Sequence, residues 1–210
     1  MNPTTTRLVM QQRLRNYFNN NNYYSGDDLN NSIQDGLDEV VALSGCVYNS
    51  ATIQFTANTT YYDMVTLLPD FIGLVAVFNN QIKRWMTPVS VKKLDGFRID
   101  WEIVGGTPWY FSIMNYRYMA IYQKPLAGNY GPMYVFYVAA APNPLTDTTI
   151  LPIPDDHMQA LENYCITDLL EQQQEFTKAT SALKDYGKRI EQLRVWMQNR
   201  RDKDRIAQLK

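Results

Sequence analysis

LTDTTILPIPDDHMQALENYCITDLL, residues 145–170, is where the chain changes from one kind of secondary structure to another. Pro152 and Pro154 interrupt any strand that reaches them, because proline lacks the amide hydrogen that a sheet ladder needs. The pair Asp155-Asp156 suits the positive end of a helix that begins here. Downstream, apolar residues recur every three or four positions, which is the helical period. The stretch therefore predicts an α+β protein, with strands before this point and helices after it.

The apolar stripe that starts here continues for about forty residues without a proline. Its members are Met158, Leu161, Cys165, Leu169, Phe176, Ala179, Leu183, Tyr186, Ile190, Leu193 and Met197. Only the glutamines at 172–174 leave a polar gap. We expect one long helix, or two helices that meet near Gly187. Because a small domain cannot cover a helix of that length, its far end should protrude or lie on another subunit.

Before the prolines, over residues 50–142, the pattern changes: Ala51, Ile53, Phe55 and Ala57 alternate with polar neighbours, with the period of two that is typical of a half-buried strand. FIGLVAVFNNQIKRW, residues 71–85, predicts two strands joined at Asn79-Asn80, and Asp95-Gly96 marks another turn. The aromatic runs PWYFSIMNYRYMAIYQ and PMYVFYVAAAP are separated by the turn cluster LAGNYGP. Strands at this spacing favour an antiparallel sandwich or small barrel.

The first part of the chain is predicted to be helical. RLVMQQRLRNYF places Met10, Leu14, Tyr17 and Phe18 on one helical face. In SGDDLNNSIQDGLDEVVALSG, Ser25 or Asp27 can cap a helix, apolar residues follow at helical spacing, and Gly45 suits a left-handed C-terminal cap. We therefore expect a helical bundle built from residues 1–48 and 152–210, an inserted antiparallel β lobe over residues 50–150, and a long C-terminal helix.

Composition and charge narrow the class of protein. Apolar residues make up 45% of the 210 and charged residues 20%, which suits a buried core. No apolar run is long enough to span a membrane and the first residues do not form a signal peptide, so we expect synthesis in a reducing cytoplasm. Residues 178–210 carry ten Lys and Arg against four acids, although the whole chain has a net charge of −1. This asymmetry favours an acidic partner for the tail.

No catalytic, cofactor or metal site is predicted. The glycine pair in WEIVGGTPWYFS, residues 101–112, lacks the lysine of a phosphate-binding loop and the third glycine of a dinucleotide fingerprint. We interpret it as a hairpin turn between residues 101–104 and 109–114. His157 is the only histidine, no nucleophile elbow occurs, and Cys46 and Cys165 lack metal-ligand spacing. The acidic pairs fall at predicted helix starts, where the helix dipole explains them.

The basic tail DYGKRIEQLRVWMQNRRDKDRIAQLK, residues 185–210, is the strongest candidate for a functional segment. Arg194, Trp196, Arg200 and Arg201 are residue types enriched at protein-interface hot spots. Three interpretations remain open for the tail: a solvated helix face, a protein-binding helix and a nucleic-acid-binding helix. The alternation of acids with bases at residues 202–205 weakens the field that DNA would need and favours a protein partner.

The order of these parts resembles the head–tail adaptor (head completion, or connector) proteins of tailed bacteriophages. The likeness covers roughly residues 25–200 and is carried by DDLNNSIQDGLDEVVAL, LLPDFIGLVAVFNNQIKRW, LDGFRIDW, GGTPWYF, AIYQKPLAGNYGPMYVFYV, LTDTTILPIPDDHMQALENYCITDLL and WMQNRRDK. The resemblance implies a virion subunit in a ring, commonly of twelve copies, between the portal and the tail or nozzle proteins. Packaged DNA would pass through its lumen without sequence-specific binding. The aromatic β region departs from a minimal all-helical adaptor and leaves the tail-side partner open.

In related adaptors the C-terminal segment reaches toward the portal. Carried over to this chain, the resemblance implies a portal contact made by Ile190, Leu193, Arg194, Trp196, Met197, Arg200 and Arg201. Our leading hypothesis is thus a structural, non-enzymatic adaptor. A nucleic-acid-binding module that uses the basic tail is the alternative, and a hydrolase acting on cell-wall or capsular sugar is a third hypothesis for which the sequence nominates no carboxylate.

Overall fold

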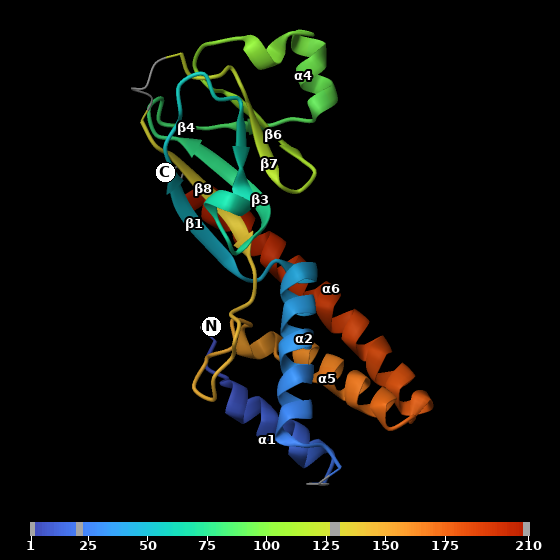
Figure 1. Cartoon of the computed structure of the whole chain (residues 1–210). Helices are drawn as coiled ribbons and strands as arrows, with labels where there is room; N and C mark the ends of the chain where they lie inside the picture. The colour runs from blue at the N-terminus through green and yellow to red at the C-terminus, as the bar shows by residue number, and fades with distance from the viewer. Residues whose placement is uncertain (1–2, 20–22, 127–130, 208–210) are drawn as a thin grey trace. The chain divides into compact units, whose positions relative to one another are not determined.

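The computed structural model of the chain describes residues 3–19, 23–126 and 131–207, with side chains as far as residue 200. It divides into two compact units, which we call the helical unit (Met1–Val47 with Ala140–Lys210) and the β unit (Tyr48–Ala139). Figure 1 shows helices α1, α2, α5 and α6 in the first and the labelled strands in the second. The described residues form six α-helices and two four-stranded sheets, neither of which closes into a barrel. The predicted α+β class is confirmed.

The two N-terminal helices follow the sequence prediction closely. Helix α1 (Arg7–Tyr17) buries Met10 and Leu14, whereas Tyr17 at its end remains 52% exposed and does not share the buried face. Helix α2 (Gly26–Ser44) begins with a capping box, in which the Ser25 side chain accepts from the Asp28 amide and the Asp28 side chain accepts from the Ser25 amide. Gly45 ends the helix at φ 62, as a left-handed cap.

The C-terminal stripe is divided into two helices, α5 (Gln159–Gln172) and α6 (Phe176–Ala207). The break lies in the glutamine stretch, where Gln174 has φ 62, and the prediction of a break near Gly187 is wrong. Gly187 lies inside α6 instead, because the reversal at 173–175 already returns the chain along α5. From Ala179 to Met197 the apolar stripe on α6 is thereby buried on the unit's own helices, except for Leu183, which is 50% exposed; Phe176 at the start of the helix is 63% exposed.

Asp155 does not begin α5, contrary to the prediction. A short 3₁₀ helix, η2 (Asp155–His157), comes first. The Asp155 carboxylate accepts hydrogen bonds from the backbone amides of Thr4 and Thr5 at 3.2 and 3.1 Å, and from both their hydroxyls. These bonds hold the pKa of Asp155 at about 2. The residue therefore ties the N-terminal segment to the start of the last two helices.

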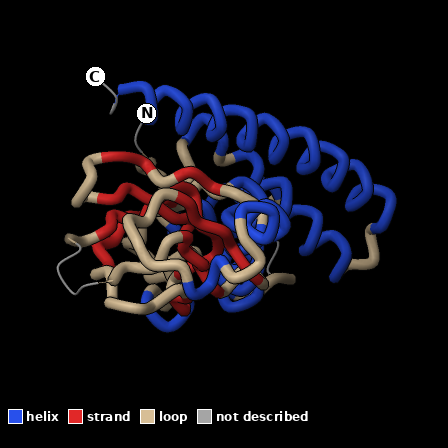
Figure 2. The backbone as a smooth tube through the Cα atoms, turned by 90° about the horizontal axis from the view of Figure 1, so that it is seen from above, coloured by secondary structure: helices blue, strands red, loops and turns tan. Residues whose placement is uncertain are grey.

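The β unit contains the two sheets, drawn in red in Figure 2. One has the order β1 (Tyr48–Ile53), β8 (Met133–Ala139), β3 (Phe71–Asn79) and β4 (Arg84–Trp85). The other has the order β2 (Tyr61–Asp63), β7 (Tyr118–Tyr122), β6 (Tyr110–Met114) and β5 (Thr87–Pro88). All pairs are antiparallel except β5 with β6. The short helix α3 (Met64–Leu67) lies between β2 and β3, and the short helix α4 (Val91–Phe97) lies between β5 and β6.

Two predicted turns of the β unit are wrong. Asp95-Gly96 lies inside α4, because the Ser90 side chain caps that helix and the following residues continue it. The residues before the glycine pair form a 3₁₀ helix, η1 (Trp101–Ile103), not a strand. Gly105 and Gly106 then run beside Lys124, whose carbonyl accepts from the Gly106 amide at 2.9 Å.

The other predicted turns are partly tested. The hairpin of β3 with β4 is confirmed, but its turn lies at residues 80–83, with Lys83 at φ 54, because Asn79 still belongs to β3 and pairs with Arg84. Most of the predicted LAGNYGP turn, residues 127–130, lies outside the described residues.

Candidate protein interface on the helical unit

Of the seven residues predicted to contact a portal, the six with described side chains lie on two different faces of α6. Ile190, Leu193 and Met197 are buried in the helical unit itself. Arg194 is exposed and pairs with Glu191 at 3.1 Å. Arg201 lies beyond the described side chains. The structure therefore presents only part of the predicted set at the surface, whereas the three apolar members hold α6 in place.

Trp196 and Arg200 belong to a small cluster with His157. The Trp196 and His157 rings lie 5.2 Å apart, and the Arg200 guanidinium lies 5.3 Å from the Trp196 ring centre. Burial lowers the pKa of His157, and the nearby Arg189 adds to this, while Asp156 opposes it. The cluster thus combines a mostly neutral ring, a half-buried tryptophan and one exposed cation, a combination suited to a protein contact.

The basic charge of α6 is partly neutralised within the helix. Ion pairs one turn apart join Glu175 to Lys178, Asp185 to Lys188 and Glu191 to Arg194, at 3.1–3.2 Å. Among the described side chains of the helix, Lys184, Arg189 and Arg200 have no such ion pair. Exposed pairs of this kind contribute little to stability, but they reduce the positive field that a phosphate backbone would meet.

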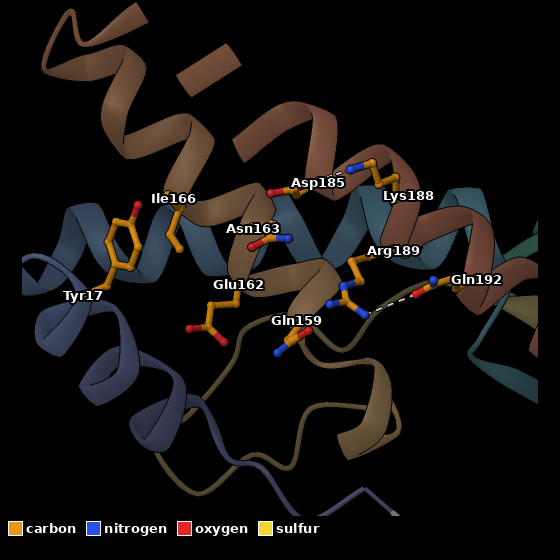
Figure 3. A pocket seen from close by; sticks show the side chains of 9 residues that line it. All are labelled: Tyr17, Gln159, Glu162, Asn163, Ile166, Asp185, Lys188, Arg189 and Gln192. Atoms are coloured by element: carbon orange, nitrogen blue, oxygen red, sulfur yellow. Dashed lines mark hydrogen bonds and ion pairs between the residues drawn. The ribbon is translucent and has the colours of Figure 1, made fainter. Parts of the chain in front are cut away.

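A polar cleft of about 470 Å³ opens between α5 and α6, with α1 at its rim. In Figure 3, Asn163 and Arg189 extend into it from the two facing helices, and Tyr17 stands at the α1 side. The lining carries both charge signs and several amides: Tyr17, Gln159, Glu162, Asn163, Ile166, Asp185, Lys188, Arg189 and Gln192. Such a surface suits a polar protein segment better than an apolar small molecule. Sequence analysis missed it, because polar residues on helices are typical of solvated faces.

The described residues give no support to a chemical site. They contain no cluster of three or more His, Cys, Asp and Glu side chains that could hold a metal ion. Cys165 is fully buried and its Sγ contacts the Ser32 carbonyl at 3.5 Å, and burial raises the pKa of the thiol, which makes it unreactive. The glycine pair leads into β6 and not into a helix N-terminus, so it lacks the geometry of a phosphate cradle.

None of the helices in the described residues is long and apolar enough to cross a membrane.

The family model described as SU10 adaptor protein matches residues 5–208. None of the curated proteins compared with the chain matches it.

Proposed function

The chain belongs to the SU10 adaptor protein family, and on this premise we propose that it is a ring-forming virion subunit that joins the phage portal to the tail. The observation that carries the proposal is the extent of the match, which spans both units and includes all of α6. An adaptor of this family is a structural component of a phage. In our proposal it has no catalytic activity and no cofactor.

The portal contact is assigned to the end of α6. Arg194, Trp196 and Arg200 would touch the portal directly, together with Arg201 further along the helix. Ile190, Leu193 and Met197 would act by fixing the helix on its unit, since they are buried there. A contact made by those three side chains would require α6 to leave the other helices, which would expose a large apolar surface.

In the assembled particle we propose a ring of about twelve copies, by analogy with head–tail adaptors, whose lumen extends the DNA channel. Closing such a ring requires two different surfaces on each copy, because cyclic assemblies are made by head-to-tail contacts. The helical unit would form a helical bundle, and the β unit would form a β-sandwich directed to tail or nozzle proteins.

The proposal is tested with purified portal rings and the full chain. Substituting Arg194 and Arg200 by Ala should prevent co-sedimentation with the portal, while Lys184→Ala on the same helix serves as the matched control. Images of the wild-type mixture should show rings on the portal. Normal docking by the double variant would reject the α6 assignment, and absence of wild-type docking would reject the adaptor role. A deletion of residues 188–210 is less informative, because it also removes buried Leu193.

Nucleic-acid binding by the tail remains the alternative. It predicts DNA affinity that falls steeply with salt and is lost when Arg200 and Arg201 are neutralised. The three ion pairs along α6 favour the protein partner, because they cancel part of the charge on which DNA binding would depend.

A further inference from the structure

Residues 84–89 of the β unit pair first with one sheet and then with the other. At the start of this segment, β4 lies against β3, and the Met86 amide donates to the Val77 carbonyl at 2.8 Å. At its end, β5 lies against β6, and the Val89 amide donates to the Phe111 carbonyl at 2.8 Å. One extended segment therefore fits between β3 and β6 and forms hydrogen bonds with both strands.

Both strand edges continue past the end of this segment. β4 pairs only with Phe78 and Asn79, β5 pairs only with Tyr110 and Phe111, and the chain then turns into α4. Among the described residues, no strand lies along this side of residues 71–76 in β3 or of residues 112–114 in β6. The outward backbone groups of such edges readily pair with another extended chain.

An apolar groove of about 330 Å³ lies between the two open edges. Two serines and six apolar residues line it, and none of its side chains is ionisable; the apolar six are Leu74, Val75, Pro88, Val89, Phe111 and Ile113. Neither β3 nor β6 contains a charged residue or a proline, which are the usual protection of an exposed edge. β3 has two register shifts, but both lie in its pairing with β8, on the side away from the groove.

We propose that this groove, which we call the strand groove, receives an extended, uncharged arm of a different virion protein. The arm would continue the line of residues 84–89 and add as a strand to β3 and β6. Backbone hydrogen bonds would supply affinity, and alternate apolar side chains would fill the groove. Only the identity of the partner as a virion protein rests on the proposed adaptor function.

The described part of this chain offers no such arm of its own. Near the N-terminus, Thr4 and Thr5 are held by Asp155, and Thr6 bridges to Ile150. The last described element, α6, is a charged helix and not an extended uncharged segment. The edge strands β1 and β2 are each already paired on one side, so they could join only one of the two edges. A second copy is therefore a poorer occupant than a foreign arm.

A synthetic peptide tests the groove directly. The probe is acetyl-Thr-Val-Thr-Val-Thr-Val-amide, and its control is the same peptide with alternate amides N-methylated, which removes hydrogen-bond donors. We expect saturable binding by NMR, with shifts confined to the residues around 71–76 and 112–114, and at least tenfold weaker binding of the methylated peptide. No saturable binding, equal binding of both peptides, or shifts elsewhere in the chain would overturn the proposal.

Protein variants add a second readout. Ile113→Asp should weaken binding of the unmodified peptide at least tenfold, because Ile113 lines the groove. Tyr116→Asp is the control: the Tyr116 side chain lies in the adjacent turn and is 85% exposed, so this variant should bind the peptide as the wild type does. The methylated peptide keeps the test decisive if Ile113→Asp fails to fold, because it requires no change in the protein.

Assembled particles identify the source of the arm. Val75 in the groove is replaced by a photo-crosslinking residue, the assembled particles are irradiated, and the peptide crosslinked to this position is identified by mass spectrometry. A link to an uncharged segment of another virion protein supports the proposal. A link to a second copy of this chain, or no link in particles that retain the chain, overturns the assigned source. Failure of the chain to enter particles at all, in the wild type, would instead count against the adaptor function.

Discussion

The hydroxyl of Tyr186 on α6 donates a 3.0 Å hydrogen bond to Glu39 Oε1 on α2. The Tyr186 ring also meets Tyr164 of α5 edge-on, with ring centres 5.6 Å apart. Burial raises the pKa of Tyr186, and the bond to Glu39 raises it further. One side chain thus joins α6 to both α2 and α5, in the first half of the helix whose end is proposed to bind the portal.

Replacing Tyr186 by Phe should lower the free energy of unfolding by about 1 kcal/mol, because the ring contacts stay and only the hydrogen bond is lost. Urea unfolding followed by circular dichroism measures this. Glu39→Gln is the matched change on the other partner and should have a similar or smaller effect. Equal stability of Tyr186→Phe and wild type would mean that the bond contributes nothing in solution.

Leu193→Ala should lower the free energy of unfolding by about 2–5 kcal/mol, the usual range for a fully buried leucine. The measurement is the same urea titration. Val195→Ala, on the exposed side of the same helix, is the control and should change stability by less than about 0.5 kcal/mol. A small effect at Leu193 would show that α6 is not packed on its unit.

Gly36→Ala and Gly187→Ala should have opposite signs. A Cβ at Gly36 would lie 2.5 Å from Tyr164 Cδ1 and 2.8 Å from Leu161 Cδ1, so overpacking should lower the free energy of unfolding by about 1–3 kcal/mol. A Cβ at Gly187 meets nothing within 4 Å, so the higher helix propensity of Ala should raise it by about 0.5–1 kcal/mol. Thermal unfolding of both variants measures these changes. Equal shifts of the melting temperature in the two variants would contradict this helix packing.

Acid should destabilise the tie between Asp155 and the N-terminal segment. The pKa of Asp155 is about 2 in the folded chain and about 3.9 in an unfolded one. Its contribution is therefore complete above pH 4 and is lost as the pH falls through 2. Asp155→Asn should lower the melting temperature at pH 7 and flatten the decline between pH 4 and 2. Asp156→Asn is the neighbouring control; identical acid profiles for the two variants would refute the assignment.

The glycine pair should tolerate a substitution by alanine better than glycines in a tight hairpin turn would. A Cβ at Gly105 would overlap Leu126, but that side chain is 59% exposed and can move, so Gly105→Ala should lower the free energy of unfolding by less than about 1 kcal/mol. Leu126→Ala should remove the effect in the double variant. Adding ATP or NAD should leave the melting temperature unchanged, and a clear rise would restore a nucleotide site.

Local patterns in the sequence predicted much of this fold. Ser25 and Gly45 bound α2 because a side-chain oxygen and a left-handed glycine satisfy the free backbone groups at the two helix ends. The runs of apolar, aromatic and β-branched residues at 71–79 and 133–139, each next to turn residues, predicted β3 and β8. These features depend on a few neighbouring residues, so one sequence is enough to read them.

Predictions from the sequence were wrong where the role of a residue depends on a partner far away in the chain. Asp155 was expected at the positive end of a helix, yet its carboxylate accepts hydrogen bonds from the amides of Thr4 and Thr5. Gly187 looked like a hinge, yet the reversal at Gln174 puts α6 on α5 and makes Gly187 an ordinary helical residue. The exposed face of α6, the polar cleft and the strand groove were not predictable, because each is made by side chains from separate elements.

The sequence by itself therefore determined the α+β class, the caps of α2, the alternating strands and the resemblance to phage adaptors. Only the tertiary structure decided which side of α6 is available, since burial of Ile190, Leu193 and Met197 depends on how α6 meets α2 and α5. It also decided that β3 and β6 end beside an open groove. Strand pairing and helix packing bring together residues that are many positions apart. The spacing of hydrophobic residues predicts that a face is buried, but it does not identify the element that packs against that face.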